Sequence, residues 1–278
     1  MRQFELVGMR RIDYQSQAFY GETTRMSDRI VALIPARMES SRLPRKPLLD
    51  ICGLPMVVHV ARRALLSSRI AQVVVCTDSV EILLACEQHG IDVCLTRASH
   101  VNGTERIAEA SETLGLDEGD IIIDVQGDEP FVQPEYIEQV SDFMVNNAYG
   151  CVVPYQLMDE YDNVNRVKIV ASGDRVIYFS RSDIPCYFGA VRQPLKKHLS
   201  VIGFRLAALR AFASARSTPL EDIERIELMR LVELGEPIGT FPQDGSSLSV
   251  DTPEDYRLAC RMMERDRLFL DHIADKVK

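Results

Sequence analysis

The sequence predicts an α/β fold: a doubly wound, mostly parallel sheet of the Rossmann-like type, with a smaller mixed or antiparallel lobe. Short apolar runs alternate with amphipathic stretches at least four times between residues 30 and 150, an order typical of parallel strands joined by helices. After about residue 150, three candidate strands follow one another with few helices between them, which indicates antiparallel pairing. The composition, 46% hydrophobic and 26% charged, allows a core of ordinary size.

The first half of the chain supplies the elements of the parallel sheet. The expected strands cover residues 30–36, 72–76, 93–96 and 121–125. Helices are expected at about 56–65, 81–89 and 105–114, with Pro134 at the first position of a further helix. In such sheets ligands bind beyond the carboxyl ends of the strands, so the loops after Pro35, Cys76 and Gln126 are the first candidates for a site.

The second half carries the lobe and further helices. The expected strands cover residues 167–171, 175–180 and 199–205. A capping box at Thr218-Pro219-Leu220-Glu221 predicts a helix that runs to about Leu234, and Thr252-Pro253-Glu254-Asp255 begins the last helix.

The domain organisation follows from the same patterns. We expect residues 28–278 to form a single domain in which 160–215 is the lobe. Residues 1–27 are polar and without periodicity, and we interpret them as a disordered extension, a mis-assigned start or an expression remnant.

The bulk properties disfavour several classes of protein. A net charge of -9 disfavours nonspecific binding to the nucleic-acid backbone, so no nucleic-acid partner is expected. No apolar run approaches the roughly 20 residues of a membrane helix, so no membrane partner is expected either. Seven scattered cysteines without a C-x-x-C pair are interpreted as reduced thiols of a cytoplasmic protein.

A cationic loop follows the first strand. Residues 35–47 hold Arg37, Arg42, Arg45 and Lys46, four cationic side chains within ten residues, and three prolines that stiffen the backbone. Converging cations are what a triphosphate requires, and Arg37 and Lys46 are the candidates to neutralise a departing pyrophosphate, with Arg42 assisting. The alternative is a surface loop with ordinary exposed charges. The loop is neither a Walker A nor a G-x-G-x-x-G sequence, which disfavours kinase and dehydrogenase functions.

Two aspartates follow strands far apart in the sequence. Asp128 comes just after the fourth strand, behind Gly127, and Asp251 comes after a short apolar stretch. Two carboxylates at strand ends are suited to one Mg²⁺, which fills its remaining positions with phosphate oxygens and water. The alternatives are that Asp128 is a turn residue before Pro130 and that Asp251 merely precedes the helix cap at Thr252.

Taken together, these segments resemble the CMP-KDO synthetase family, the cytidylyltransferases that activate 3-deoxy-manno-octulosonate (KDO). The resemblance covers roughly residues 29–260. The segments that carry it are, in order, Ile34-Pro35-Ala36-Arg37, Ser41-Arg42-Leu43-Pro44, Lys46-Pro47-Leu48, Gly53-Leu54-Pro55-Met56, His59-Val60, Thr77-Asp78, Gly103-Thr104-Glu105-Arg106, Val125-Gln126-Gly127-Asp128-Glu129-Pro130, Tyr178-Phe179-Ser180-Arg181, His198-Leu199 and Val250-Asp251-Thr252-Pro253-Glu254-Asp255.

The resemblance implies a fold, a reaction and a set of roles. The fold is that of a Rossmann-like nucleotidyltransferase, and the reaction transfers CMP from CTP to a small acidic acceptor, KDO or a close analogue, with release of pyrophosphate. Mg²⁺ is the implied cofactor, with Asp128 and Asp251 as its ligands. A homodimer is implied, with the lobe carrying much of its interface and part of the acceptor site.

The resemblance also assigns individual residues. Arg37, Lys46 and Asp128 are the implied catalytic residues. Nucleotide binding is implied for Ala36, Arg37, Arg42, Lys46, Thr77, Gly103, Thr104, Arg106 and Asp128. Acceptor binding is implied for Gln126, Arg181, His198 and Glu227, with the Arg181 guanidinium suited to the carboxylate of the acceptor.

Four positions depart from the family pattern. The family usually has glycine at Arg45, serine at Asn102, tyrosine at Ile202 and glutamine at Leu228. The last two lie toward the sugar by resemblance, so the loss of a hydroxyl and an amide there indicates either a smaller, less hydroxylated acid or neutral drift.

These departures leave other functions open. The alternative acceptors are an amino-substituted KDO, another 2-keto sugar acid, or a phosphonate such as phosphonoformate. A different class, a catalytically silent nucleotide-binding or scaffolding protein, is disfavoured by the intact Arg37, Lys46, Asp128 and Asp251.

Overall fold

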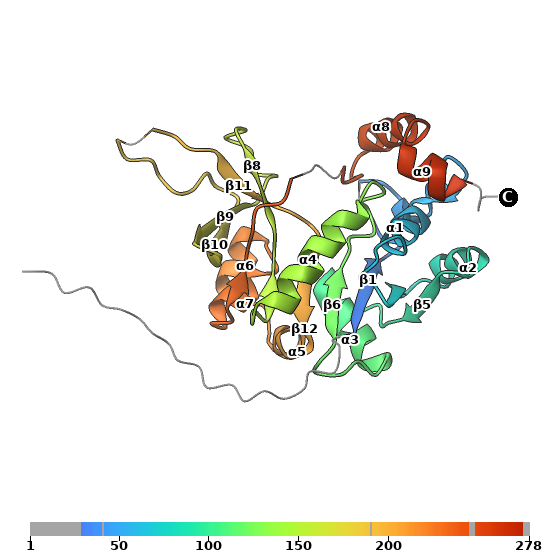
Figure 1. Cartoon of the computed structure of the whole chain (residues 1–278), viewed down its shortest axis with the longest axis horizontal. Helices are drawn as coiled ribbons and strands as arrows, with labels where there is room; N and C mark the ends of the chain where they lie inside the picture. Colours follow the sequence, from blue (N-terminus) through green and yellow to red (C-terminus); the bar gives the residue numbers. More distant parts are fainter. Residues whose placement is uncertain (1–28, 41, 190, 245–247, 275–278) are drawn as a thin grey trace, which may run out of the picture.

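The computed structural model describes residues 29–40, 42–189, 191–244 and 248–274, and the predicted extension over 1–27 lies outside them. In the described part, eleven strands form one mixed sheet in the order β5-β4-β1-β6-β12-β7-β13-β10-β9-β11-β8 (Figure 1). A two-stranded hairpin, β2 (Asp50–Ile51) and β3 (Leu54–Pro55), lies outside this sheet.

The parallel half of the sheet is built around its most apolar strand. β1 (Ile30–Ala36) pairs in parallel with β4 (Gln72–Thr77) and with β6 (Ile121–Asp124), and β5 (Asp92–Leu95) adds to β4. Successive side chains of β1 enter opposite faces, because a strand has a period of two. Both faces are therefore buried, as the near-continuous apolar sequence predicts.

Helices cover both faces of this half. One hydrophobic cluster joins Ala32 and Ile34 of β1 to α1 (Met56–Ala64), α2 (Val80–Gln88), α4 (Pro134–Asn146), α8 (Pro253–Met263) and α9 (Arg267–His272). The other joins Val31 and Leu33 to α3 (Gly103–Thr113), α5 (Leu206–Ser214) and α7 (Met229–Glu233). The doubly wound arrangement is thus confirmed (Figure 1).

The antiparallel half continues the same sheet instead of forming a separate one. β12 (Ile202–Arg205) pairs antiparallel with β6 and with β7 (Cys151–Val152), and β13 (Ile238–Gly239) links β7 to the lobe. From here on the lobe means the strands β8 (Tyr155–Met158), which precedes the expected range 160–215, β9 (Lys168–Ser172), β10 (Arg175–Ser180) and β11 (Leu195–His198), with the loops that join them. They project from the body of the molecule in Figure 1, and β10, β9, β11 and β8 follow one another with antiparallel pairing.

Two predicted elements are wrong in extent. The helix expected from residue 219 to Leu234 is broken into α6 (Pro219–Glu224) and α7, because Arg225 adopts a left-handed conformation (φ 54°) that ends α6. The strand expected over 199–205 begins only at Ile202, because Leu199 bonds back to the Pro154 carbonyl before β12 starts. The break between α6 and α7 carries Glu227, one of the predicted acceptor residues.

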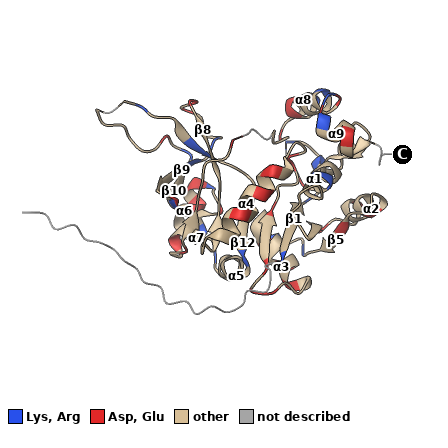
Figure 2. Cartoon of the chain, viewed as in Figure 1, with Lys and Arg blue, Asp and Glu red and all other residues tan. Residues whose placement is uncertain are grey.

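No helix among the described residues is long and apolar enough to cross a membrane. All seven cysteines are free thiols. Acidic residues lie along α4, α6 and α8 with basic residues interspersed between the elements (Figure 2). The cations needed for an anionic ligand must therefore be gathered locally, and the loop after β1 does this.

Candidate active site

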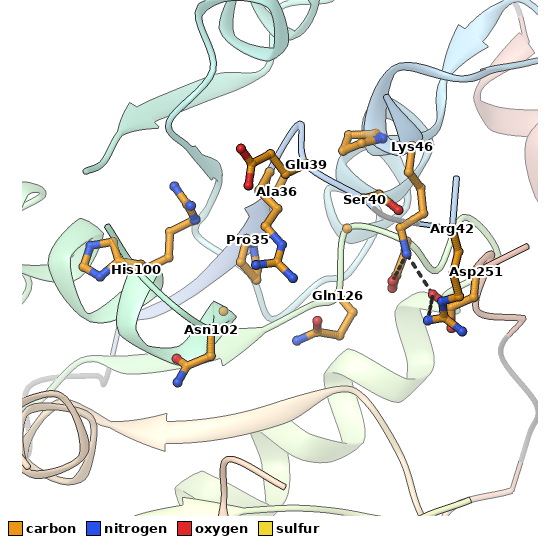
Figure 3. A pocket seen from close by; sticks show the side chains of 16 residues that line it. Pro35, Ala36, Glu39, Ser40, Arg42, Lys46, His100, Asn102, Gln126 and Asp251 are labelled. Atoms are coloured by element: carbon orange, nitrogen blue, oxygen red, sulfur yellow. Dashed lines mark hydrogen bonds and ion pairs between the residues drawn. The ribbon is translucent and has the colours of Figure 1, made fainter. Parts of the chain in front are cut away.

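A cavity of about 310 Å³ opens where the carboxyl ends of β1 and β6 meet the start of α3 (Figure 3). This is the edge at which the topology predicts a ligand site. The predicted site residues that line it are Ala36, Arg37, Arg42, Lys46, Gly103, Arg106, Gln126, Asp128 and Asp251. Their roles stay predictions, but the chain brings them to one place from four separate segments.

The cationic loop is shaped by its backbone. Arg45 adopts a left-handed conformation (φ 57°), and Pro47 then occupies the short 3-10 helix Lys46–Leu48. This turn sends neighbouring side chains in different directions: Arg45 pairs with Glu81 on α2 at 2.5 Å, whereas Lys46 enters the cavity. Arg37 is exposed at the cavity and has no ion-pair partner among the described residues, so its charge is available to an anionic ligand.

Asp128 and Asp251 converge on one cation. Lys46 Nζ lies 2.6 Å from Asp128 Oδ2 and 3.0 Å from Asp251 Oδ1, and Arg42 lies 3.1 Å from the same Asp251 oxygen. Val250 donates its backbone N–H to the Asp128 carbonyl at 2.9 Å, which holds the two segments side by side. Burial opposes the charge of Lys46, but the two carboxylates outweigh it and raise the pKa of Lys46 above its ordinary value.

The distances from Lys46 also show that Mg²⁺ fits between Asp128 and Asp251. Two carboxylates close enough to contact one ammonium group are close enough to bind one metal ion. No group of three or more potential metal ligands of the His, Cys, Asp and Glu types occurs in the described ranges. A pair is nevertheless sufficient for Mg²⁺, because it keeps several waters and takes the rest of its shell from substrate phosphates.

Two glycines allow the walls of the cavity to approach each other. A Cβ on Gly127 would stand 2.8 Å from the backbone oxygen of Pro35, which no real Cβ tolerates. A Cβ on Gly103 would stand 3.2 Å from Pro35 Cγ. The loop after β6 and the start of α3 therefore pack directly against the end of β1, and glycine is required at position 127 for this reason.

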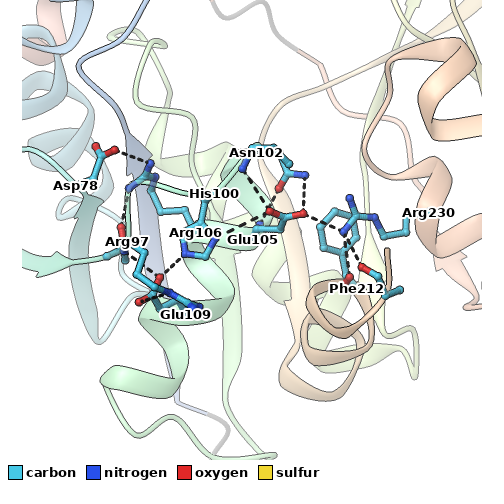
Figure 4. A network of polar contacts seen from close by, with 12 residues as sticks. Asp78, Arg97, His100, Asn102, Glu105, Arg106, Glu109, Phe212 and Arg230 are labelled. Carbon is cyan, nitrogen blue, oxygen red and sulfur yellow. Dashed lines mark hydrogen bonds and ion pairs between the residues drawn. The ribbon is translucent and has the colours of Figure 1, made fainter. Parts of the chain in front are cut away.

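The start of α3 is fixed by a polar network that Figure 4 shows. Asn102 caps the helix by accepting a bond from the Glu105 N–H at 2.8 Å, so asparagine does at this position what serine also does at helix N-caps. The buried Arg106 donates to Thr96 Oγ1 at 2.6 Å and pairs with Asp78 at 3.3 Å. Arg230 of α7 pairs with Glu105 at 3.1 Å. Arg106 therefore lines the cavity with its guanidinium already held.

Two further nucleotide-binding candidates lie behind the cavity surface. Thr77 is fully buried at the end of β4, where its hydroxyl accepts a bond from the Ser79 N–H at 3.1 Å. Thr104 is fully buried beside Glu227. Neither residue lines the cavity. Both lie in the layer of buried side chains behind the residues that line it.

Asp124 is a buried carboxylate that the sequence analysis did not single out. Gln126 donates its Nε2 to both Asp124 carboxylate oxygens at 3.0 Å, so the nitrogen end of its amide faces Asp124. Burial, with Glu227 and Asp128 nearby, raises the pKa of Asp124 well above its usual range. The sequence held a partial signal, because Asp124 lies within the expected strand 121–125, whose other residues are all apolar.

The structure does not bring Arg181 to the cavity. Its side chain donates to the backbone carbonyls of Glu224, Arg225 and Val164 at 2.7, 3.0 and 3.0 Å. The first two are orphan carbonyls at the end of α6, so Arg181 caps that helix. Three of its five N–H donors are used in this way, so the expected grip of this guanidinium on an acceptor carboxylate stays a prediction.

The other two acceptor candidates also lie outside the cavity lining. Burial lowers the pKa of His198 to about 4, so its ring is neutral near pH 7, and it contacts Phe179 edge to face at 5.8 Å. Burial raises the pKa of Glu227, which the Thr104 hydroxyl and amide partly offset. Both are at the junction between the lobe and the helices below it.

The two departures on the acceptor side are core residues. Ile202 and Leu228 are 3% and 1% exposed and belong to the same hydrophobic cluster as Phe204. Apolar side chains at these positions are explained by packing. Neither side chain therefore offers a polar group that could form a hydrogen bond with an acceptor.

Comparisons with known proteins agree with this geometry. The chain matches the cytidylyltransferase family over residues 31–238. A 3-deoxy-manno-octulosonate cytidylyltransferase of Neisseria meningitidis serogroup B is 41% identical over 239 residues, covering 81% of this chain and 94% of that protein. One of Nitratiruptor is 38% identical over 232 residues, covering 81% and 96%.

A solved structure gives the same result in three dimensions. It is a CMP:2-keto-3-deoxy-manno-octonic acid synthetase complexed with CTP, with a TM-score of 0.81 and 33% identity over 86% of this chain and 99% of that one. Both the predicted resemblance and the predicted fold class are thereby confirmed. The chain belongs to the 3-deoxy-manno-octulosonate cytidylyltransferase family.

Proposed function

We propose that this protein is a cytoplasmic, magnesium-dependent cytidylyltransferase that transfers CMP from CTP to 3-deoxy-manno-octulosonate and releases pyrophosphate. One observation carries the proposal. Asp128 and Asp251 converge within 3.0 Å of one cation, in a cavity that also presents the uncommitted charge of Arg37. The family supplies the nucleotide and the acceptor, and the seven free thiols support a reducing compartment.

The residues act mainly by positioning and charge. Arg37 and Lys46 neutralise the β- and γ-phosphates, so that pyrophosphate leaves as the acceptor oxygen attacks the α-phosphorus in line. For KDO that oxygen is the anomeric hydroxyl. Asp128 and Asp251 would hold Mg²⁺, which when bound would lower the pKa of the attacking hydroxyl and offset developing charge. Gly127 and Gly103 let the loop after β6 and the start of α3 pack against the end of β1, which sets the shape of the cavity.

An acceptor panel tests the proposal. Purified protein is incubated with CTP, Mg²⁺ and one acceptor at a time, and pyrophosphate release is followed. We expect the highest kcat/KM with KDO, compared with an amino-substituted KDO, another 2-keto sugar acid and phosphonoformate. A higher kcat/KM for one of the other acids would show that this acid, and not KDO, is the preferred acceptor. Pyrophosphate release from none of them, while CTP still binds, contradicts the enzymatic function.

A further inference from the structure

Lys46 occupies the point where the site carboxylates meet. Its ammonium lies 2.6 Å from Asp128 and 3.0 Å from Asp251, and its side chain is 15% exposed against 27% and 35% for the two acids. Arg42 is 65% exposed and touches only the outer acid, Asp251. Lys46 is therefore the principal counter-ion of the pair, and it is held from both sides.

A divalent cation at this pair needs the oxygens that Lys46 uses. Mg²⁺ binds carboxylate oxygens at about 2.0–2.1 Å, so an ion on Asp128 Oδ2 and Asp251 Oδ1 would lie in the space of the ammonium. Two cations in such contact repel each other strongly, the more so in a partly buried site. The pair can hold the lysine or the metal ion, but not both in this arrangement.

We propose that Lys46 is an exchangeable counter-ion. It neutralises Asp128 and Asp251 in the free protein and moves to the triphosphate when nucleotide and metal ion arrive together. This inference rests on the proposed function, and it adds an order of events within the site. In the free protein the Lys46 ammonium therefore occupies the metal site. In the complex with nucleotide and metal ion it stabilises the leaving pyrophosphate.

The surroundings of Lys46 allow this movement. The backbone on either side is fixed by the left-handed Arg45 and by Pro47, but the side chain is a flexible four-carbon stem. Lys46 and Arg37 line the same cavity, so the phosphates that Arg37 attracts also lie within the reach of Lys46. The binding of metal ion and nucleotide is then cooperative, because each favours the state in which Lys46 has left the carboxylates.

Metal binding to the nucleotide-free protein tests the exchange directly. Mn²⁺ serves as the probe, and free Mn²⁺ is measured by electron paramagnetic resonance during a titration. We expect Lys46→Met to bind Mn²⁺ at least about tenfold more tightly than the natural protein, because two carboxylates lose their counter-ion. Arg45→Gln is the matched control: it removes one positive charge from the adjacent position, whose side chain pairs with Glu81 instead. It should leave Mn²⁺ affinity unchanged within about twofold.

Two outcomes overturn the proposal. One is an unchanged or weaker Mn²⁺ affinity in Lys46→Met, or a gain of the same size in Arg45→Gln. The other is a gain in Mn²⁺ affinity that persists in the double variant Lys46→Met/Asp251→Asn. Asp251 would then not be a ligand, and the Mn²⁺ would be bound elsewhere. Circular dichroism checks the fold of each variant, and Lys46→Gln replaces Lys46→Met if the latter is unfolded. None of these titrations uses CTP or an acceptor, so a failed acceptor panel does not alter their meaning.

Discussion

At the residue scale, contacts from neighbouring residues fix the backbone at both site aspartates. The backbone around Asp128 is fixed by Gly127 against Pro35 and by the bond from Val250. Asp251 precedes α8, whose cap at Thr252 is closed by Asp255. A change of charge at position 128 therefore alters the chemistry of the site without moving the backbone.

We predict that Asp128→Asn lowers kcat by about a thousandfold or more at saturating Mg²⁺, because an amide is a poor ligand for a hard divalent ion. The measurement is pyrophosphate release with CTP and KDO. The melting temperature should stay within a few degrees of the natural value. Asp142→Asn, the same substitution on the outer side of α4, is the control and should retain full activity. Comparable turnover in Asp128→Asn would remove this residue from the metal site.

Asp124 gives a second prediction, with an explicit pH dependence. Its pKa is raised in the folded state, so it contributes stability at acid pH that is lost as pH rises through the folded pKa. Asp124→Asn removes a buried charge and should raise stability near pH 8 by about 1 kcal/mol or more, with a smaller gain near pH 5. Thermal unfolding at both pH values measures this. An equal change at the two pH values would show that Asp124 does not titrate as described.

The same substitution has an expected cost in function. Nε2 of Gln126 donates to both Asp124 oxygens, so the carboxylate fixes which end of the amide faces the cavity. An asparagine at 124 can either accept from or donate to Gln126, which leaves the amide two orientations. We expect a several-fold rise in the KM of the acceptor with a smaller change in kcat. Rotation of the Gln126 amide is the physical cause, not loss of fold.

At the scale of elements, the sequence predicted what depends on local pattern. The strand Ile30–Ala36 was predicted to the residue because its seven positions are apolar and end at a cationic loop. Pro134 and Thr252 marked helix starts correctly. The break at Arg225 was not predictable, because no glycine, asparagine or proline marks it and the residue that caps it, Arg181, lies 44 positions away. Long-range capping of this kind leaves no local signal.

Arg181 offers the prediction that belongs to this scale. As a cap of α6 it should contribute to stability, and we expect Arg181→Met to lower the free energy of unfolding by about 1–2 kcal/mol, since three hydrogen bonds from a half-buried cation are lost. Denaturant unfolding measures the effect. The KM for the acceptor separates the two roles of this residue. A large rise in KM with unchanged stability would restore the carboxylate-binding role implied by the family.

At the scale of the whole molecule, most of the predicted nucleotide-binding residues line the cavity, whereas three of the four predicted acceptor-binding residues lie outside its lining. Arg37, Lys46 and Asp128 follow the ends of parallel strands, where the topology of the sheet gathers them. The sequence pattern made Asp251 a candidate, but only the family resemblance favoured its metal-binding role over that of a residue before the Thr252 cap. Its 205-residue separation from Lys46 leaves no local signal of their contact. Arg181, His198 and Glu227 sit outside the cavity lining, since their positions depend on how the lobe and α7 pack in three dimensions.

The lobe presents apolar side chains that the single chain does not cover. Its exposed residues include Leu157, Val164, Ile177, Phe188 and Val191, at 58%, 63%, 53%, 98% and 81% exposure. Apolar groups concentrated on one projecting element are typical of an interaction surface. The homodimer implied by the family would bury such a surface against a second copy, and we propose that the lobe does so here.

This gives the last prediction. The natural protein should have about twice the mass of one 31.4 kDa chain in light scattering coupled to size exclusion. Phe188→Glu should shift the mass to that of a monomer, because a charge within an apolar interface cannot be desolvated without a partner. The monomer fold should be unaffected, since the Phe188 side chain is 98% exposed.

Val80→Glu is the control. It makes the same kind of change at a 60% exposed position on α2, outside the lobe, and should leave the dimer intact. A dimer that survives Phe188→Glu unchanged, or that dissociates equally in Val80→Glu, would place the interface elsewhere than on the lobe.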